Sequence, residues 1–415
     1  MSSLDRIREV YTIAIETLFK APVIAAEERP VWPPRSELLP DRGFALNQFF
    51  QMFCRFYIET YPEPMLLCAS EEAASTVPVT YVLPEGINNT GELVSSDDKL
   101  VPISLRPKVI HSIPDLNIYP FVNRNRAPHV SDRSHSIVVV GGGPVGLYMA
   151  GIVKTCAPDI EVHLVENRVT DRTRYLTRKQ VITLGRTKIT DFLSAVTAMG
   201  ELLDATCPIL KKLLFTTKAE TGEPIINLLY HVYKGTNSVT IQYIEYILAK
   251  YAESKGVHIH HDSSMATIED IEGSYINEHT LAVVDATGGR LLRAENRTSR
   301  FSLSRTAKLQ YVEQLTLLEE RAANAVPIST FPVYEGYLTP EQSAHKRNHY
   351  LYIAIGDTFL KTDFMHGAAI PFGAAISIAI VLVLLRELKE KSTLTGGRRR
   401  QVRKQKTRKN KLRKN

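Results

Sequence analysis

The residues best suited to chemistry lie in the run GGGPVG, residues 141–146, where Gly141, Gly143 and Gly146 satisfy the pattern G-x-G-x-x-G. The run follows the apolar stretch SIVVV and opens the helical pattern LYMAGIVKTC. In this context the first glycine permits a tight turn, the second lets the backbone approach a pyrophosphate, and the third lets the helix pack closely on the strand. The N–H groups at the start of the helix favour an anion there. The spacing therefore predicts a dinucleotide site at this turn, with Pro144 inside it.

An acidic residue strengthens this interpretation. Glu166 ends the next apolar run, EVHLVE, and follows Gly146 by 20 residues. At this position a carboxylate accepts hydrogen bonds from the ribose of a bound adenosine. A solvated glutamate at the end of a strand is the alternative. The strand–helix–strand context favours the dinucleotide site.

Two later runs have the same form, an apolar strand followed by small residues. In VVDATGGR, residues 283–290, Gly288 would let the backbone approach a ligand, although an ordinary strand and turn explains the run as well. In YIAIGDTF, residues 352–359, Asp357 could accept hydrogen bonds from a polyol such as a ribityl chain. Alternatively, Asp357 caps the segment that follows.

Taken in order, GGGPVG with Glu166, DATGG and IGDTF resemble the FAD-binding fingerprint of the group A flavoprotein monooxygenase superfamily, and most of all the MICAL-type monooxygenase domain. The resemblance covers residues 136–390 and implies a Rossmann-like FAD-binding fold. It also implies hydroxylation of an oxidisable substrate, with NAD(P)H as the reductant. It assigns cofactor contacts to Arg178 and, in the turn after Asp357, to Gly367. The turn departs from the family pattern because its proline stands at position 371, and no catalytic residue is assigned.

Two other classes of function stay open. One is a catalytically degenerate, flavoprotein-like structural or packaging protein that binds nucleic acid through a basic tail. The other is a dehydrogenase that uses NAD alone. The IGDTF run disfavours the dehydrogenase, because a simple dinucleotide has no ribityl chain to bind.

Composition places most of the positive charge in that tail. The chain has 415 residues, 44% of them hydrophobic and 23% charged, which excludes collagen-like and fully disordered proteins. Residues 398–415 hold 11 Lys and Arg and no acidic residue, and the rest of the chain has 40 basic and 44 acidic residues. We expect residues 391–415 to be a disordered tail that binds nucleic acid or an anionic surface. The tail resembles those of large-DNA-virus proteins, which implies a virion or viral-factory location.

The elements that must position the site fall in two parts. Residues 1–134 hold 14 of the 22 prolines and are predicted to be an accessory region of unknown function. Within it, helical spacing predicts one helix near residues 4–18 and another, with a buried aromatic face, near residues 44–61. Strands and helices then alternate through residues 135–390, which predicts an α/β FAD-binding domain.

Cysteines and one apolar run complete the predictions. The four cysteines are far apart and form no CxxC pair, so we expect buried, reduced thiols. Together with the charged N-terminus, this favours a cytoplasmic or nuclear protein that is not secreted. Residues 368–385 carry no charge, and we expect a buried helix rather than the alternative, a membrane anchor.

Overall fold

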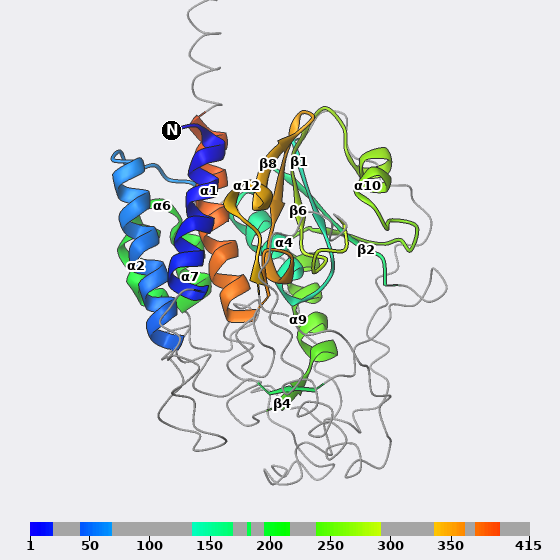
Figure 1. Cartoon of the computed structure of the whole chain (residues 1–415), viewed down its shortest axis with the longest axis horizontal. Coiled ribbons are helices and arrows are strands. Elements are labelled where there is room, and N and C mark those ends of the chain that lie inside the picture. Colours follow the sequence, from blue (N-terminus) through cyan, green and yellow to red (C-terminus); the bar gives the residue numbers. More distant parts are fainter. Residues whose placement is uncertain are drawn as a thin grey trace, which may run out of the picture.

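The centre of the protein is a mostly parallel six-stranded sheet in the order β5-β2-β1-β6-β9-β8 (Figure 1). The structure is a computed structural model that describes residues 1–19, 42–68, 135–168, 181–183, 195–215, 238–291, 336–361 and 370–390. The strands of the sheet are β1 (Ser136–Val140), β2 (Glu161–Glu166), β5 (His258–His261), β6 (Thr280–Asp285), β8 (Ala344–Arg347) and β9 (Tyr350–Ala354). Only β8, at one edge, runs antiparallel to its neighbour. The predicted mixed α/β architecture is confirmed.

The strand order changes direction at β1. This strand pairs in parallel with β2 on one side and with β6 on the other, and all five of its residues are buried. Its β-branched residues suit a strand that is covered on both faces. Ligands in open α/β sheets bind at the carboxyl ends of the strands beside such a switch in order. The fold therefore places the predicted glycine turn where a dinucleotide is expected.

Helices α4 (Pro144–Cys156) and α9 (Ile241–Ser254) pack against each other beside the sheet. The short helix α10 (Ile268–Tyr275) lies to the right of the sheet in Figure 1. Smaller elements complete the described chain. Their bounds are β3 (Val181–Thr183), β4 (Ser238–Thr240), β7 (Gly336–Tyr337), β10 (Leu360–Lys361), α12 (Pro340–Ser343) and the 3₁₀ turns η5 (Thr197–Met199) and η7 (Gly356–Thr358). In the two small sheets, β3 pairs with β4 and β7 pairs with β10.

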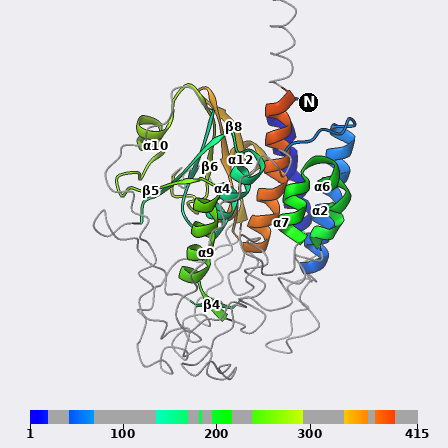
Figure 2. The ribbon, with the colours of Figure 1, turned by 180° about the vertical axis from the view of Figure 1, so that it is seen from behind.

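A group of helices stands beside the sheet on the side away from α10, as Figure 2 shows. It contains α1 (Ser3–Ala14) with its π-helical extension η1 (Ile15–Phe19), α2 (Arg42–Thr60), α6 (Gly200–Thr206) and α7 (Pro208–Phe215). A capping box between Ser2 and Asp5 begins α1. The predicted aromatic face of α2 is buried, namely Leu46, Phe49, Phe50, Phe53 and Tyr57. Both helices predicted in the first 68 residues are confirmed.

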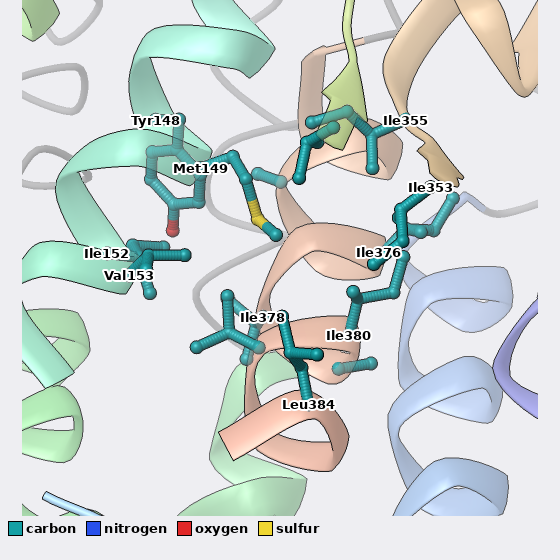
Figure 3. Packing of buried hydrophobic residues seen from close by; sticks show 14 of the residues in the cluster. Tyr148, Met149, Ile152, Val153, Ile353, Ile355, Ile376, Ile378, Ile380 and Leu384 are labelled. Carbon is teal, nitrogen blue, oxygen red and sulfur yellow. The ribbon is translucent and has the colours of Figure 1, made fainter. Parts of the chain in front are cut away.

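The uncharged run forms most of a 21-residue helix, Ile370–Glu390, which we call the C-terminal helix. It is long and apolar enough to cross a membrane, with a mean hydropathy of 2.0. However, 94% of its apolar window is buried inside the protein. Figure 3 shows its side chains, Ile376 and Ile378 among them, packed among those of α4 and β9. Core packing therefore accounts for its composition.

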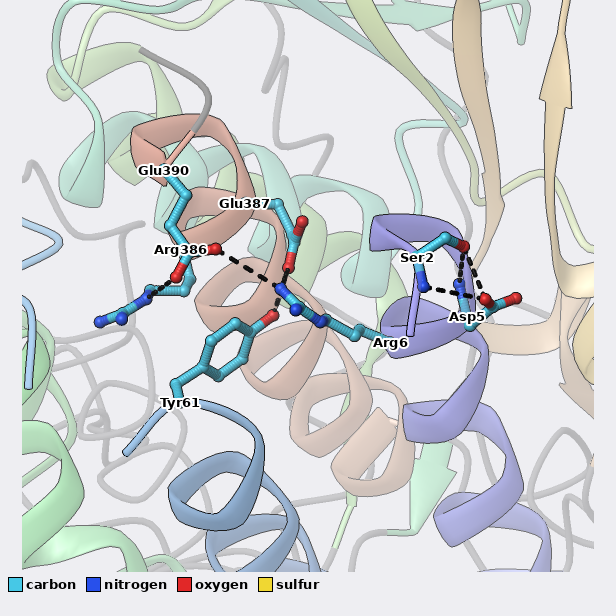
Figure 4. Close-up of polar contacts among 7 residues, drawn as sticks. All are labelled: Ser2, Asp5, Arg6, Tyr61, Arg386, Glu387 and Glu390. Carbon is cyan, nitrogen blue, oxygen red and sulfur yellow. Dashed lines mark hydrogen bonds and ion pairs between the residues drawn. The ribbon is translucent and has the colours of Figure 1, made fainter. Parts of the chain in front are cut away.

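The two ends of the described chain are joined by a polar cluster (Figure 4). Glu387 Oε1 accepts hydrogen bonds from Arg6 Nη1 and from the Tyr61 hydroxyl, each at 2.6 Å. The guanidinium groups of Arg6 and Arg386 each lie 5.0 Å from the centre of the Tyr61 ring. Residues 1–68, where described, thus share the core of the sheet. The domain boundary at residue 134 stays a prediction, and the tail at 391–415 lies outside the described residues.

The prediction of four reduced thiols is wrong for two cysteines. Cys68 and Cys207 form a disulfide, with their Cα atoms 5.1 Å apart. These residues are 139 positions apart, so their spacing in the sequence gave no sign of the pairing. Cys54 and Cys156 are free; Cys156 is buried, as expected, whereas Cys54 is half-buried.

Candidate dinucleotide site

The first glycine of the turn is held by the protein's own backbone. Gly141 has a φ of +108°, which favours glycine, and its N–H donates to the Val165 carbonyl at 2.8 Å. A Cβ at Gly141 would lie only 2.7 Å from the Ala286 carbonyl oxygen. The turn between β1 and α4 is therefore tight, and it lies directly against the chain that leaves β6.

The other two glycines of the turn meet different surroundings. A Cβ at Gly146 would lie 2.0 Å from the Gly141 carbonyl oxygen, so close packing of helix on turn requires glycine there. Gly143 is the N-cap of α4, followed by Pro144, and a Cβ at Gly143 would meet no atom of the described residues within 4 Å. Its φ of −73° suits any residue. Open space thus lies beside the N-terminus of α4, where backbone N–H groups lack intrahelical partners.

Glu166 reaches the same turn from the end of β2. Its side chain is buried, and its Oε2 atom accepts a hydrogen bond from Gly142 N–H at 2.6 Å. The guanidinium of Arg168 binds both carboxylate oxygens, through Nε at 2.9 Å and Nη2 at 2.8 Å. Burial alone would raise the pKa of Glu166, but the hydrogen bonds and charge of Arg168 hold it below its usual value. Glu166 is therefore an ionised carboxylate.

Arg168 is bound by a second buried carboxylate. Its Nη1 atom lies 3.2 Å from Glu245 Oε1, on α9, and the side chain of Glu245 is fully buried. One cation thus links the end of β2 to α9 and compensates two buried negative charges. In this arrangement, the ribose contact predicted for Glu166 requires Arg168 to release at least one of its oxygens.

A second cluster, around Asp285, shapes the loop after β6. Asp285 is fully buried, and its Oδ2 atom accepts a hydrogen bond from the Tyr352 hydroxyl at 2.6 Å. Its Oδ1 atom accepts hydrogen bonds from Thr287 N–H at 2.8 Å and from the Thr287 hydroxyl at 2.7 Å. Burial raises the pKa of Asp285, and these hydrogen bonds oppose the rise. The carboxyl group acts here as an organiser of the loop.

Thr358 connects that loop to the predicted Asp357. Gly288 and Gly289, both with positive φ, each donate an N–H to Thr358 Oγ1 at 2.9 Å. Thr358 Oγ1 lies in turn 3.2 Å from Asp285 Oδ1. A Cβ at Gly288 would lie 3.8 Å from the Cβ of Asp357, which is exposed. The structure therefore brings Gly288 and Asp357 together.

Val145, in the first turn of α4, lies against the turn that holds Asp357 and against the start of the C-terminal helix. Built Cβ atoms at Gly356 and Gly373 would lie 3.2 Å and 2.6 Å from the side chain of Val145. The start of α4, the Asp357 turn and the start of the C-terminal helix thus meet at the carboxyl ends of β1, β6 and β9. Of the predicted site residues, Arg178 and Gly367 lie outside the described residues.

Three residues that shape this region were not predicted from the sequence. Asp285 stood within the run already singled out, and an acid ending a wholly apolar strand was a usable signal. Arg168 follows Glu166 by two positions, so a pairing of the two was also foreseeable. Thr358 carried no signal, because its role depends on the loop after β6 meeting the turn after β9.

Comparison with known proteins gives remote likenesses only. No family model matches the chain, and no curated protein matches it. Among solved structures, a Diels-Alderase of pyrroindomycin biosynthesis, PyrE3, is 13% identical, with a TM-score of 0.30, and the match covers 58% of this chain and 63% of that one. A tetrameric 2-methyl-3-hydroxypyridine-5-carboxylic acid oxygenase is also 13% identical, with a TM-score of 0.32, covering 60% of this chain and 86% of that one. The function is therefore inferred from the geometry of the site.

Proposed function

We propose that the protein is an FAD-binding oxidoreductase of the monooxygenase type, with NAD(P)H as its reductant and an oxidisable substrate whose identity is open. One observation carries the proposal: in the part of the chain that the structure describes, the N-terminus of α4 faces open space at Gly143, beside the strand where the order of the sheet changes direction. Such a position offers N–H groups without partners inside the helix, and the positive end of the helix dipole, to a pyrophosphate.

Different residues of the site would bind the different parts of FAD. The N–H groups of Val145 and Gly146 would bind the pyrophosphate, because Pro144 has none to offer. Asp357, exposed beside Gly288, would accept hydrogen bonds from the ribityl hydroxyls. Bound flavin would supply the redox chemistry, while the protein orients it and excludes water.

The adenosine end needs one local change. Glu166 would bind the ribose once Arg168 frees one of its oxygens, and Arg168 would then keep its ion pair with Glu245. Because the ion pair with Glu245 of α9 would persist, the positive charge of Arg168 would stay compensated during this change. The predicted roles of Arg178 and Gly367 remain part of the proposal.

The test uses the purified full-length chain. We expect it to carry, or to take up from added FAD, a chromophore with the visible absorbance of flavin, and anaerobic addition of NADH or NADPH to bleach that absorbance. Bleaching by only one of the two would identify the reductant. A protein that stays colourless in excess FAD would contradict the proposal. Flavin that neither nucleotide reduces would contradict its oxidoreductase part.

A second candidate rests on two other observations. The strongly basic segment 398–415 suits the phosphates of nucleic acid, and Arg168 occupies the carboxylate that a ribose would need. On this alternative the protein is a degenerate, flavoprotein-like structural or packaging protein. Deleting residues 396–415 should then abolish salt-sensitive binding to nucleic acid and leave FAD uptake unchanged. Unchanged binding to nucleic acid would contradict this role of the tail.

A further inference from the structure

Three buried cysteines meet at the end of α4 opposite the glycine turn. The Sγ atoms of Cys68, Cys156 and Cys207 all lie within 4.8 Å of one another. Cys68 and Cys207 are joined as a disulfide, and the free Cys156 has its sulfur 3.5 Å from that of Cys207. A free thiol therefore lies in contact with one specific sulfur of a disulfide.

The backbone around each sulfur is fixed by neighbouring contacts. Beside the disulfide, Leu67 N–H donates to the Thr206 carbonyl at 2.6 Å, so the two linked segments are held together independently of the bond. Beside the thiol, the Thr155 hydroxyl lies 2.6 Å from the Tyr251 hydroxyl of α9. Three parts of the chain thus pack together and hold the sulfurs close: the segment that follows α2, the end of α4, and the junction between α6 and α7.

We propose that these cysteines form an intramolecular thiol–disulfide exchange site. The Cys156 thiolate attacks Cys207 Sγ, the Cys156–Cys207 bond forms, and the Cys68–Cys207 bond breaks. Cys68 leaves as a thiolate and takes up the proton that Cys156 gave up. The step exchanges one disulfide for another and one thiol for another, so it needs no external oxidant or reductant.

Burial sets the rate of this exchange. Burial raises the pKa of the Cys156 thiol to about 12, and only the thiolate attacks a disulfide. Burial is the cause of this rise, and no positive group within the described ranges opposes it. The exchange is therefore slow at neutral pH and accelerates about tenfold for each added pH unit, in step with the thiolate fraction.

The exchange would change which parts of the protein are cross-linked. The present bond ties the segment after α2 to the junction of α6 and α7. The alternative bond ties the same junction to Cys156, the last residue of α4, whose first turn forms the candidate dinucleotide site. Cys207 is the shared partner in both forms. The present bond lies within the helical group, and the alternative bond links that group to α4.

The experiment incubates the full chain at alkaline pH for increasing times, traps each sample by acid quenching and maps the disulfides after digestion at acid pH. Wild type should accumulate the Cys156–Cys207 peptide beside the Cys68–Cys207 peptide, and faster at higher pH. Cys156→Ser should keep only the Cys68–Cys207 peptide. Cys54→Ser is the matched control, because this free cysteine of α2 lies outside the cluster, and it should behave as wild type.

A second variant tests the geometry without relying on the rate. Cys68→Ser, treated with oxidised glutathione, should form the Cys156–Cys207 disulfide, since its two sulfurs are already in contact. Circular dichroism and an unchanged oligomeric state would show that the variant is folded. Absence of the Cys156–Cys207 peptide from trapped wild type would overturn the exchange. Its absence from folded Cys68→Ser would overturn the arrangement of the sulfurs.

Discussion

Arg168 donates to both carboxylate oxygens of Glu166, and the same guanidinium reaches Glu245 across the gap between β2 and α9. A bidentate pair of this kind fixes geometry as well as charge. It holds the carboxylate that also accepts the Gly142 N–H, so the glycine turn, the end of β2 and α9 form one connected unit. The ion pair therefore holds the turn together, and under the proposed function it must open before Glu166 can accept a ribose hydroxyl.

Replacing Arg168 by Met should destabilise the protein strongly, because two buried carboxylates each lose their ion pair with Arg168. Breaking a buried pair from one side costs about 3–5 kcal/mol. Urea unfolding at neutral pH measures the change. Arg55→Met is the matched control, since Arg55 pairs with Glu59 on the surface of α2, where solvent screens an ion pair and it contributes little to stability. Equal losses in the two variants would refute the role given to Arg168.

Removing the Tyr352 hydroxyl tests the Asp285 cluster. Tyr352→Phe takes one hydrogen bond from a fully buried carboxyl group and should cost about 1.5–3 kcal/mol of unfolding free energy. Tyr148→Phe is the control, because the Tyr148 hydroxyl is buried without a hydrogen-bond partner in the described part of the chain. That change should be neutral or slightly stabilising. A Tyr352→Phe variant as stable as wild type would show that the cluster does not hold the loop.

Histidines between β2 and β5 should make the stability depend on pH. Burial lowers the pKa of His163 to about 4 and that of His260 to about 3, whereas both take up protons near 6.5 in the unfolded chain. The unfolded state therefore binds more protons below pH 6.5. Stability is complete above that value and falls as the pH drops toward about 4.

Urea unfolding at a series of pH values checks this dependence. His163→Asn should flatten the slope between pH 6.5 and 4, because it removes the buried member of a histidine pair in which His163 Nδ1 lies 3.1 Å from Nε2 of the half-buried His260. His258→Asn, on the exposed side of the same group, should leave most of the slope in place. A slope unchanged by His163→Asn would assign the pH dependence to other groups.

Local pattern predicted the elements of the fold well, for physical reasons. SIVVV is β-branched and wholly apolar, as a central parallel strand must be, and the glycine run after it marked the turn into α4. The aromatic stripe of α2 follows helical spacing and lies in the core. The uncharged C-terminal run was predicted to form a buried helix rather than a membrane anchor, and 94% of its apolar window is buried inside the protein.

Contacts between distant segments could not be predicted in this way. The Cys68–Cys207 disulfide depends on the packing of α6 and α7 beside the segment after α2. The ion pair between Arg168 and Glu245 joins residues 77 positions apart and depends on the packing of α9 beside the end of β2. Both outcomes depend on which side chains the tertiary structure brings together, and one sequence does not encode that as a pattern.

The most direct test of the central claim is FAD binding by Gly143→Leu, measured as a change in flavin fluorescence on titration with protein. The new side chain would extend into the open space at the N-terminus of α4, in a backbone conformation that accepts it. Gly273→Leu is the control, because a Cβ there also meets open space, on the distant α10. We predict that wild type and Gly273→Leu bind FAD alike, and that Gly143→Leu, with an unchanged unfolding midpoint, binds at least about tenfold more weakly, a loss of about 1.4 kcal/mol or more. Equal binding by all three proteins, or none by wild type, would contradict a dinucleotide site at this turn.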